Sequence, residues 1–206
     1  MTAERKAAYI LAGIAAVEGA FVMLSAWRAP LRFLALIGFA PGRSGAPLGW
    51  SAAAMTVAAF VLVSARLPSV RATMFKPSGL KVLGLAVAVA AGILEELVFR
   101  KLLMDWLAQS DYGATIQMLV SGVAFGAAHG VWGLFGRSMR AAVGATIATG
   151  IPGFALGVVY IASGRSLAPC VAAHFLINAL MEPGLVLAAT RAEMGLRPSR
   201  AHNPMA

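Results

Sequence analysis

Two adjacent carboxylates in a long apolar segment are the first residues of this sequence that could do chemistry. Glu95 and Glu96 lie in Gly-Ile-Leu-Glu-Glu-Leu-Val-Phe-Arg, residues 92–100. Glu96 and Arg100 are four residues apart, so on a helix they share a face and can form an ion pair. Glu95 is rotated by about 100° from Glu96 and has no such partner on its own helix. The spacing therefore predicts a supporting role for Glu96 and leaves Glu95 free to act as a general base.

Two histidines and an asparagine occur in two further apolar segments. His129 ends the sequence Phe-Gly-Ala-Ala-His at 125–129. The last apolar segment carries polar residues at a spacing of four, which predicts one shared helix face: Cys170, His174, Asn178 and Glu182. Ionisable side chains cost a few kcal/mol each inside hydrocarbon, so they need partners or a purpose. A lone histidine there is usually a packing residue, whereas this combination of residues indicates a catalytic site.

The elements that must position these groups are long apolar helices. The chain has 206 residues, of which 60% are hydrophobic and 12% charged, and its mean hydropathy is +0.80. A soluble domain carries about twice that charged fraction, and about 20 apolar residues suffice to cross a bilayer. The sequence predicts an all-α, polytopic transmembrane helix bundle of about six spans, with a range of five to seven. The expected spans cover residues 7–27, 48–65, 80–108, 113–135, 139–163 and 167–189.

These spans predict a single transmembrane domain over residues 1–190, with its catalytic core at 80–182 and a polar tail at 191–206. The region 139–163 is interrupted at Pro152 and is expected to be one kinked span or two short ones. Small residues recur every four positions in two of the helices, which predicts close helix packing there. They are Gly84, Ala88 and Gly92 in one helix and Gly122, Gly126 and Gly130 in the other.

The net charge of +9 is distributed in a way that excludes a nucleic-acid role. Basic residues lie at the ends of the apolar runs or between them, where they orient helices and meet anionic headgroups. No basic face with interleaved aromatic residues occurs, so the expected partner is the lipid bilayer. Cys170 is the only cysteine, which excludes a disulfide within the chain and a four-thiolate zinc site.

Taken together, EELVFR at 95–100, FGAAH at 125–129 and HFLIN at 174–178 resemble the CAAX-processing and bacteriocin-processing (CPBP, or Abi) family of intramembrane glutamic endopeptidases. The three motifs occur in the family's order, and the resemblance covers roughly residues 80–182. It implies a peptide hydrolase that forms no covalent intermediate and requires no metal or other cofactor. Its substrate would be a peptide or protein at the membrane.

The resemblance also implies a role for each motif residue. Glu95 and His129 would activate the attacking water, and His174 and Asn178 would stabilise the oxyanion. Glu96 and Arg100 would hold the helix of Glu95 in register. Phe125 would shape the wall behind His129. The small size and Ala-rich composition are typical of a multi-pass protein of a prokaryotic plasma membrane.

Other functions compete with this interpretation. Two histidines and a glutamate can ligate catalytic zinc, although no His-Glu-x-x-His pair is present. A thiol mechanism would use Cys170 with His174, and a serine mechanism would use Ser121 or Ser163. A proton-coupled transporter could use the intramembrane carboxylates, including Glu18. A non-catalytic membrane scaffold is a further alternative, but every motif residue is present.

Overall fold

The computed structural model describes residues 1–131 and 139–191, and this part of the chain consists of helices joined by turns and loops, without strands. The helices are α1 (Ala3–Arg28), α2 (Pro30–Leu36), α3 (Pro47–Ser64), α4 (Pro68–Thr73), α5 (Gly79–Glu96), the π-helical segment η1 (Leu97–Met104), α6 (Asp105–Gln109), α7 (Ala114–His129), α9 (Met139–Ala162), α10 (Ala168–Met181) and α11 (Gly184–Thr190). Residues 192–206 of the predicted tail at 191–206, and residues 132–135 of the helix predicted at 113–135, lie outside the described residues.

Long apolar helices dominate the described residues, as the sequence predicts. Four of them are long and apolar enough to cross a membrane, namely α1, α3, the continuous helix Gly79–Gln109 and α9, and the bent pair α10–α11 makes a fifth. Large apolar side chains such as Trp27, Leu62 and Val123 face outward, where lipid rather than water can solvate them. The protein is therefore an integral membrane helix bundle. The remaining predicted span, at 113–135, corresponds to α7, an apolar helix of 16 residues.

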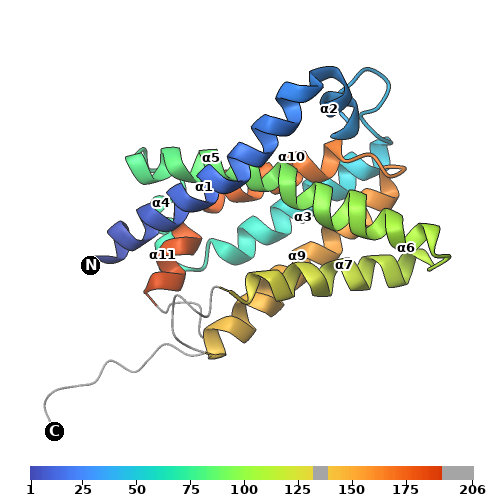
Figure 1. The fold of residues 1–206 in the computed structure, drawn as a ribbon. Coiled ribbons are helices and arrows are strands. Elements are labelled where there is room, and N and C mark those ends of the chain that lie inside the picture. The colour runs from blue at the N-terminus through green and yellow to red at the C-terminus, as the bar shows by residue number, and fades with distance from the viewer. Residues whose placement is uncertain (132–138, 192–206) are drawn as a thin grey trace, which may run out of the picture.

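The helices that carry the motifs are linked by packing, because α10 packs against α5 and α7 packs against η1 (Figure 1). Helix α5 contacts α1 and α10, and α7 runs beside α9. The small-residue positions make these approaches close, because a Cβ added at Gly92 would lie 3.2 Å from the backbone nitrogen of Phe175. A Cβ added at Gly122 would lie 2.9 Å from the backbone nitrogen of Phe154. The predicted close-packing positions are confirmed at both interfaces.

The last predicted span is bent, which corrects the expectation of one helix over 167–189. Helix α10 ends at Met181, α11 begins at Gly184, and the two are bent by 59°. The residue before a proline disfavours helical dihedral angles, and Glu182, which precedes Pro183, is extended at φ −82° and ψ 144°. Glu182 therefore leaves the helix face that its spacing predicted. Its Oε2 instead accepts a hydrogen bond from the backbone nitrogen of Val186 at 3.3 Å.

The other proline-containing span stays in one piece. Pro152 lies inside α9, which runs from Met139 to Ala162 as a single helix. Of the two alternatives left open by the sequence, one span rather than two short ones is therefore correct. This long helix gives α7 a continuous surface to pack against, and that surface positions the second motif.

Candidate active site

The carboxylate pair sits where the α5 helix changes its winding. Glu96 is the last residue of α5, and the π-helical segment Leu97–Met104 follows it directly. Segments of π-helix are rare and are frequent at functional sites. Ser121 on α7 donates a hydrogen bond to the carbonyl oxygen of Phe99 at 3.0 Å, which ties this segment to the neighbouring helix. The unusual winding thus lies next to the two carboxylates and is held in place from outside.

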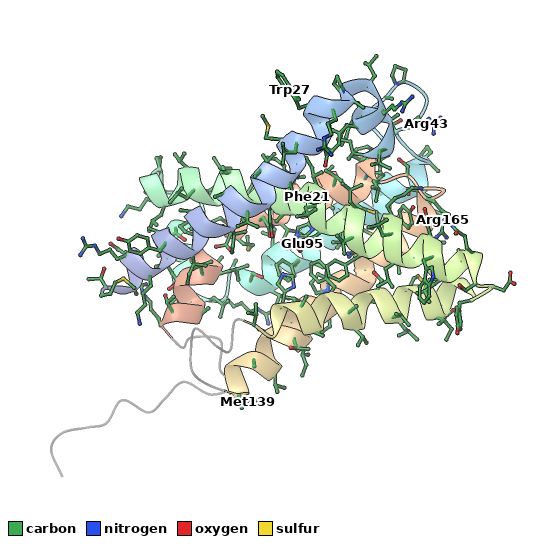
Figure 2. All side chains as sticks on the ribbon, viewed as in Figure 1. Phe21, Trp27, Arg43, Glu95, Met139 and Arg165 are labelled. Carbon is green, nitrogen blue, oxygen red and sulfur yellow. The ribbon has the colours of Figure 1, made fainter. Side chains whose placement is uncertain are left out.

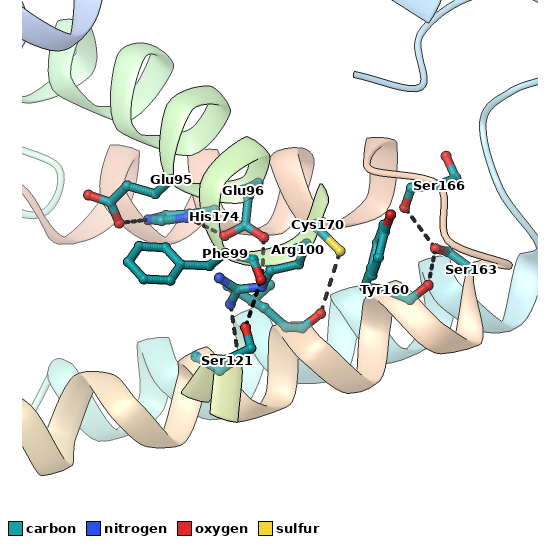
Figure 3. Close-up of polar contacts among 12 residues, drawn as sticks. Glu95, Glu96, Phe99, Arg100, Ser121, Tyr160, Ser163, Ser166, Cys170 and His174 are labelled. Atoms are coloured by element: carbon teal, nitrogen blue, oxygen red, sulfur yellow. Dashed lines mark hydrogen bonds and ion pairs between the residues drawn. The ribbon is translucent and has the colours of Figure 1, made fainter. Parts of the chain in front are cut away.

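Glu96 forms the buried, fully paired half of the site (Figure 3). Its Oε2 lies 3.0 Å from Nε of Arg100, and neither side chain is exposed. Its Oε1 lies 2.8 Å from Nδ1 of His174 on α10. Arg100 also donates from Nη2 to the carbonyl oxygen of Gly153 on α9 at 2.9 Å. The predicted Glu96–Arg100 pair is confirmed, and it joins three helices through His174 and Gly153.

Glu95 forms the looser half of the site. Its Oε2 lies 3.8 Å from Nε2 of His129 and 3.8 Å from Nε2 of His174. Both separations are too long for direct hydrogen bonds but can be bridged by one water molecule. The Glu95 and His129 side chains are 19% and 20% exposed, whereas His174 is 6% exposed. The structure therefore brings Glu95, His129 and His174 together, as the sequence analysis expected.

The hydrogen bonds of the two histidines determine which ring nitrogen faces Glu95. Nδ1 of His129 lies 2.9 Å from the carbonyl oxygen of Phe125, and Nδ1 of His174 lies 2.8 Å from the Glu96 carboxylate. Carbonyl and carboxylate oxygens only accept hydrogen bonds, so each Nδ1 carries a proton. In the neutral form of either ring, Nε2 then presents its lone pair toward Glu95. The site can therefore accept protons from a bound water at more than one atom.

Phe125 forms the wall between the two histidines. Its ring is stacked on His129 with centroids 4.5 Å apart and meets His174 edge-on at 5.7 Å. The Arg100 guanidinium carbon lies 5.0 Å from the centroid of the Phe125 ring. The ring also packs edge-on against Phe99 at 5.1 Å, a contact that the sequence analysis did not identify. This packing limits how far either imidazole can rotate.

Asn178 lies one turn beyond His174 on α10. Its side chain is half-buried and forms no hydrogen bond within residues 1–131 and 139–191. Its backbone oxygen accepts from the nitrogen of Glu182 at 2.8 Å, which completes the last turn of the helix. The spacing of four from His174 gives both side chains a similar direction. Asn178 is therefore free to donate its amide protons to a ligand.

Two residues near the site were given no catalytic or supporting role from the sequence. Glu18 on α1 interacts electrostatically with Glu95 and His174. Its Oε2 is buried without a hydrogen-bond partner in the described part of the chain. Lys81 donates from Nζ to three carbonyl oxygens at the end of α10, those of Ala179 at 2.6 Å, Leu180 at 3.2 Å and Glu182 at 2.8 Å. Lys81 thereby fixes the helix of His174 against the helix of Glu95.

The hydroxyl and thiol groups of the competing mechanisms are engaged elsewhere. Cys170 is fully buried, and its Sγ donates toward the carbonyl oxygen of Leu156 at 3.5 Å. Ser121 is bonded to the carbonyl oxygen of Phe99, as described above, and Ser163 Oγ lies 2.8 Å from the carbonyl oxygen of Tyr160. None of the three is hydrogen-bonded to a histidine, as an activated nucleophile would be. The Glu95 cluster is the better candidate for catalysis.

A metal site would need several ligating side chains that converge on one point. Among the described residues, no group of three His, Cys, Asp or Glu side chains is arranged to hold a metal ion. The absence of a metal requirement stays a prediction.

Residues 77–180 match the family described as Type II CAAX prenyl endopeptidase Rce1-like. The matched segment begins just before α5 and ends near the end of α10, so it includes all seven residues expected to be catalytic or supporting. No curated protein and no solved structure matches the chain at a significant level.

Proposed function

Because this chain belongs to the Rce1-like family of type II CAAX prenyl endopeptidases, we propose that it cleaves its membrane-associated substrate with a water molecule activated by Glu95. Membership of the family makes the chain an intramembrane peptide hydrolase of the CAAX type. The observation that carries the mechanism is the position of Glu95 Oε2, 3.8 Å from Nε2 of both His129 and His174. A water molecule that lies to one side of the line joining two of these atoms can be held by two acceptors at once.

In the proposed first step, Glu95 removes a proton from the water as its oxygen attacks the scissile carbonyl carbon. Nε2 of His129 accepts the second proton of the water in a hydrogen bond and so directs a lone pair toward the substrate. The carbonyl π electrons move to the oxygen, which becomes an oxyanion. Glu95 is suited to this step because the nearest ring nitrogens stand 3.8 Å from its Oε2, whereas the two oxygens of Glu96 are held at 3.0 and 2.8 Å by Arg100 and His174.

In the proposed second step, the tetrahedral intermediate collapses. His174 in its protonated form donates from Nε2 to the oxyanion while its Nδ1–H remains hydrogen-bonded to Glu96, and the Asn178 amide is the second donor. One such donor is typically worth about 3–4 kcal/mol in the transition state. Glu95 then returns its proton to the leaving nitrogen as the C–N bond breaks. The products are a carboxylic acid, which loses the second proton of the water to become a carboxylate, and a free amine, and no bond to the enzyme is formed.

The supporting residues act by holding this geometry. Glu96 and Arg100 fix the α5–η1 junction, and Phe125 confines both imidazoles. The site lies among membrane-spanning helices, so the scissile bond must be presented near the bilayer, as in a prenylated C-terminal tail or another membrane-bound peptide. The plasma membrane of a prokaryote is the proposed location.

The proposal is tested by adding the purified chain, in detergent, to three sets of fluorogenic peptides. One set carries a prenylated C-terminal cysteine, the second is the same set without the prenyl group, and the third is a mixed apolar library. We expect cleavage by the wild type, with a chelator present or absent, and loss of cleavage in Glu95→Ala. Chelator sensitivity that is restored by zinc would replace this mechanism with a metal-dependent one.

A further inference from the structure

A second polar region lies at one end of the bundle, away from Glu95. It is a hollow of about 680 Å³ between the α2–α3 connection, the α9–α10 connection and η1. Figure 2 shows Arg43 and Arg165 at this end of the molecule, with Met139 at the opposite end and Glu95 between them. The hollow is separate from the seven residues of the proposed catalytic site, none of which lines it. Its volume is in the range of small-ligand pockets.

The charged residues that line the hollow are all basic. They are Arg32, Arg43, Lys101 and Arg165. Asp105 is the one carboxylate paired with this group in the described part of the chain, and it contacts Lys101 Nζ at 2.7 Å and Arg165 Nη2 at 2.6 Å. The guanidinium groups of Arg32 and Arg43 are exposed and form no ion pair or side-chain hydrogen bond within the described ranges. Two cations therefore remain available to an anion in the hollow.

Several residues that line the hollow have positive φ angles, a backbone conformation that glycine adopts more easily than other residues. Gly38, Gly42, Gly45 and Gly164 have positive φ angles, and so does Arg165 at 65°. A non-glycine residue in this conformation is uncommon and needs support from its surroundings. Arg165 has that support from Asp105, from Gln117 Oε1 at 3.0 Å from its Nη1, and from the Tyr160 ring 5.2 Å away.

The two connections are also bonded to each other. Ser166 Oγ donates to the carbonyl oxygen of Arg43 at 2.6 Å, and the nitrogen of Ala46 donates to the carbonyl oxygen of Ser163 at 3.1 Å. A Cβ added at Gly45 would lie 2.9 Å from the Cβ of Ser166, so the connections approach each other closely. The basic side chains therefore project from a fixed frame, which favours binding of a defined group over a diffuse ion cloud.

The surroundings of the hollow indicate which anion it takes. It lies where α1 and α9 end and α3 and α10 begin, which is one end of the membrane-spanning bundle. The end of α1, α2, the α2–α3 connection and the start of α3 carry exposed aromatic and aliphatic side chains, among them Trp27 (86% exposed), Leu31 (79%), Phe39 and Trp50. Tryptophan and basic residues gather at the level of lipid headgroups. We propose that the hollow binds the phosphate group of an anionic membrane lipid, with the acyl chains lying along the exposed apolar side chains of α1 and α2.

The proposal goes beyond peptide hydrolysis and is tested by binding alone. Wild-type protein in a neutral detergent is titrated calorimetrically with short-chain phosphatidylglycerol, with short-chain phosphatidylcholine and with inorganic phosphate. We expect one saturable site for phosphatidylglycerol. The double variant Arg32→Gln/Arg43→Gln should bind it roughly tenfold to thirtyfold more weakly, because each cation near an anionic headgroup contributes about fivefold and the two factors multiply. Arg32→Lys/Arg43→Lys, which keeps the charge, should retain most of the affinity.

The matched control is Arg66→Gln/Arg71→Gln. It removes the same charge from two exposed residues near α4, away from the hollow, and should bind phosphatidylglycerol like the wild type. Equal binding by the Arg32→Gln/Arg43→Gln variant and the wild type would overturn the proposal, as would equal binding of phosphatidylcholine. If inorganic phosphate competes as strongly as the lipid, the site binds free phosphate and the lipid assignment is wrong. Thermal unfolding in the same detergent checks that each variant is folded.

Discussion

Two carboxylates on the same continuous helix are equally exposed and yet differently bound. Glu95 and Asp105 lie ten residues apart in the helix Gly79–Gln109, and each side chain is 19% exposed. Asp105 is saturated, with Tyr160 Oη at 3.0 Å, Arg165 Nε at 2.9 Å and Lys101 Nζ at 2.7 Å. Glu95 has ring nitrogens at 3.8 Å on two sides.

The difference shows that burial alone does not distinguish the proposed catalytic carboxylate from a structural one in this bundle. A carboxylate whose oxygens are filled by short contacts holds helices together, because moving it would break several charge-assisted hydrogen bonds. A carboxylate whose partners stand beyond hydrogen-bonding distance keeps its oxygen available to bind and deprotonate a water molecule. We therefore give Asp105 a structural role in helix packing and Glu95 the proposed role of general base.

The largest effect on activity is expected from removing His129, one of the two histidines near Glu95. His129→Ala should lower kcat by about 10²–10⁴-fold, the usual contribution of a residue that takes part in acid–base catalysis. Its side chain is 20% exposed, so the melting temperature should change little. Initial rates and thermal unfolding of the same preparation check both statements. A variant that melts early and cleaves normally at low temperature would show that His129 is only a packing residue.

Substitution in the buried Glu96–Arg100 pair beside Glu95 should mainly lower the stability of the fold. Glu96→Ala leaves the guanidinium group of Arg100 buried without its partner, which typically costs about 3–5 kcal/mol. Activity should fall as well, because His174 loses the acceptor of its Nδ1 proton. Equilibrium unfolding in mixed micelles measures the first effect. An unchanged unfolding free energy would mean that the pair does not stabilise the helix packing.

A smaller loss of stability is expected from substitution of Asp105, whose oxygens have several short contacts. Asp105→Asn weakens the contacts to Lys101 and Arg165, and we expect about 1–3 kcal/mol of destabilisation. At temperatures well below unfolding, kcat/KM should stay within about threefold of the wild type, on the order of 0.7 kcal/mol or less. A large fall in kcat with normal stability would place Asp105 in the catalytic machinery and break the comparison.

The smallest effect is expected at the lone thiol. Cys170→Ala removes one buried sulfur that contacts the Leu156 carbonyl, and it should cost about 1 kcal/mol of stability or less. Cleavage should continue at the wild-type rate and should resist thiol-alkylating reagents in both proteins. Loss of cleavage in this variant would favour the thiol mechanism over the Glu95 mechanism.

Local patterns in the sequence predicted the features that depend on neighbours along one helix. The Glu96–Arg100 pair follows from a spacing of four, and the close approach at Gly92 follows from a row of small residues. The break at Glu182 had a local signal in Pro183, but the regular spacing of polar residues from Cys170 onward outweighed it and gave the wrong face.

Features that depend on contacts between distant segments could not be predicted from the sequence. Lys81 caps carbonyl oxygens about a hundred residues away, and Glu18 approaches Glu95 from another helix. The π-helical winding after Glu96 has no residue signature that distinguishes it from an α-helix. The basic hollow also escaped prediction, because Arg43 and Arg165 meet only when two connections pack together.

The central claim is tested most directly by comparing initial cleavage rates of the wild type, Glu95→Gln and Asp105→Asn on one prenylated peptide. Both substitutions remove a single carboxylate charge from the same helix at equal exposure. The account predicts that Glu95→Gln loses at least about 10³-fold in kcat, near the middle of the range for a general base, and keeps its melting temperature. Asp105→Asn should keep its rate. Wild-type cleavage by Glu95→Gln, or equal losses in the two variants, would contradict the account.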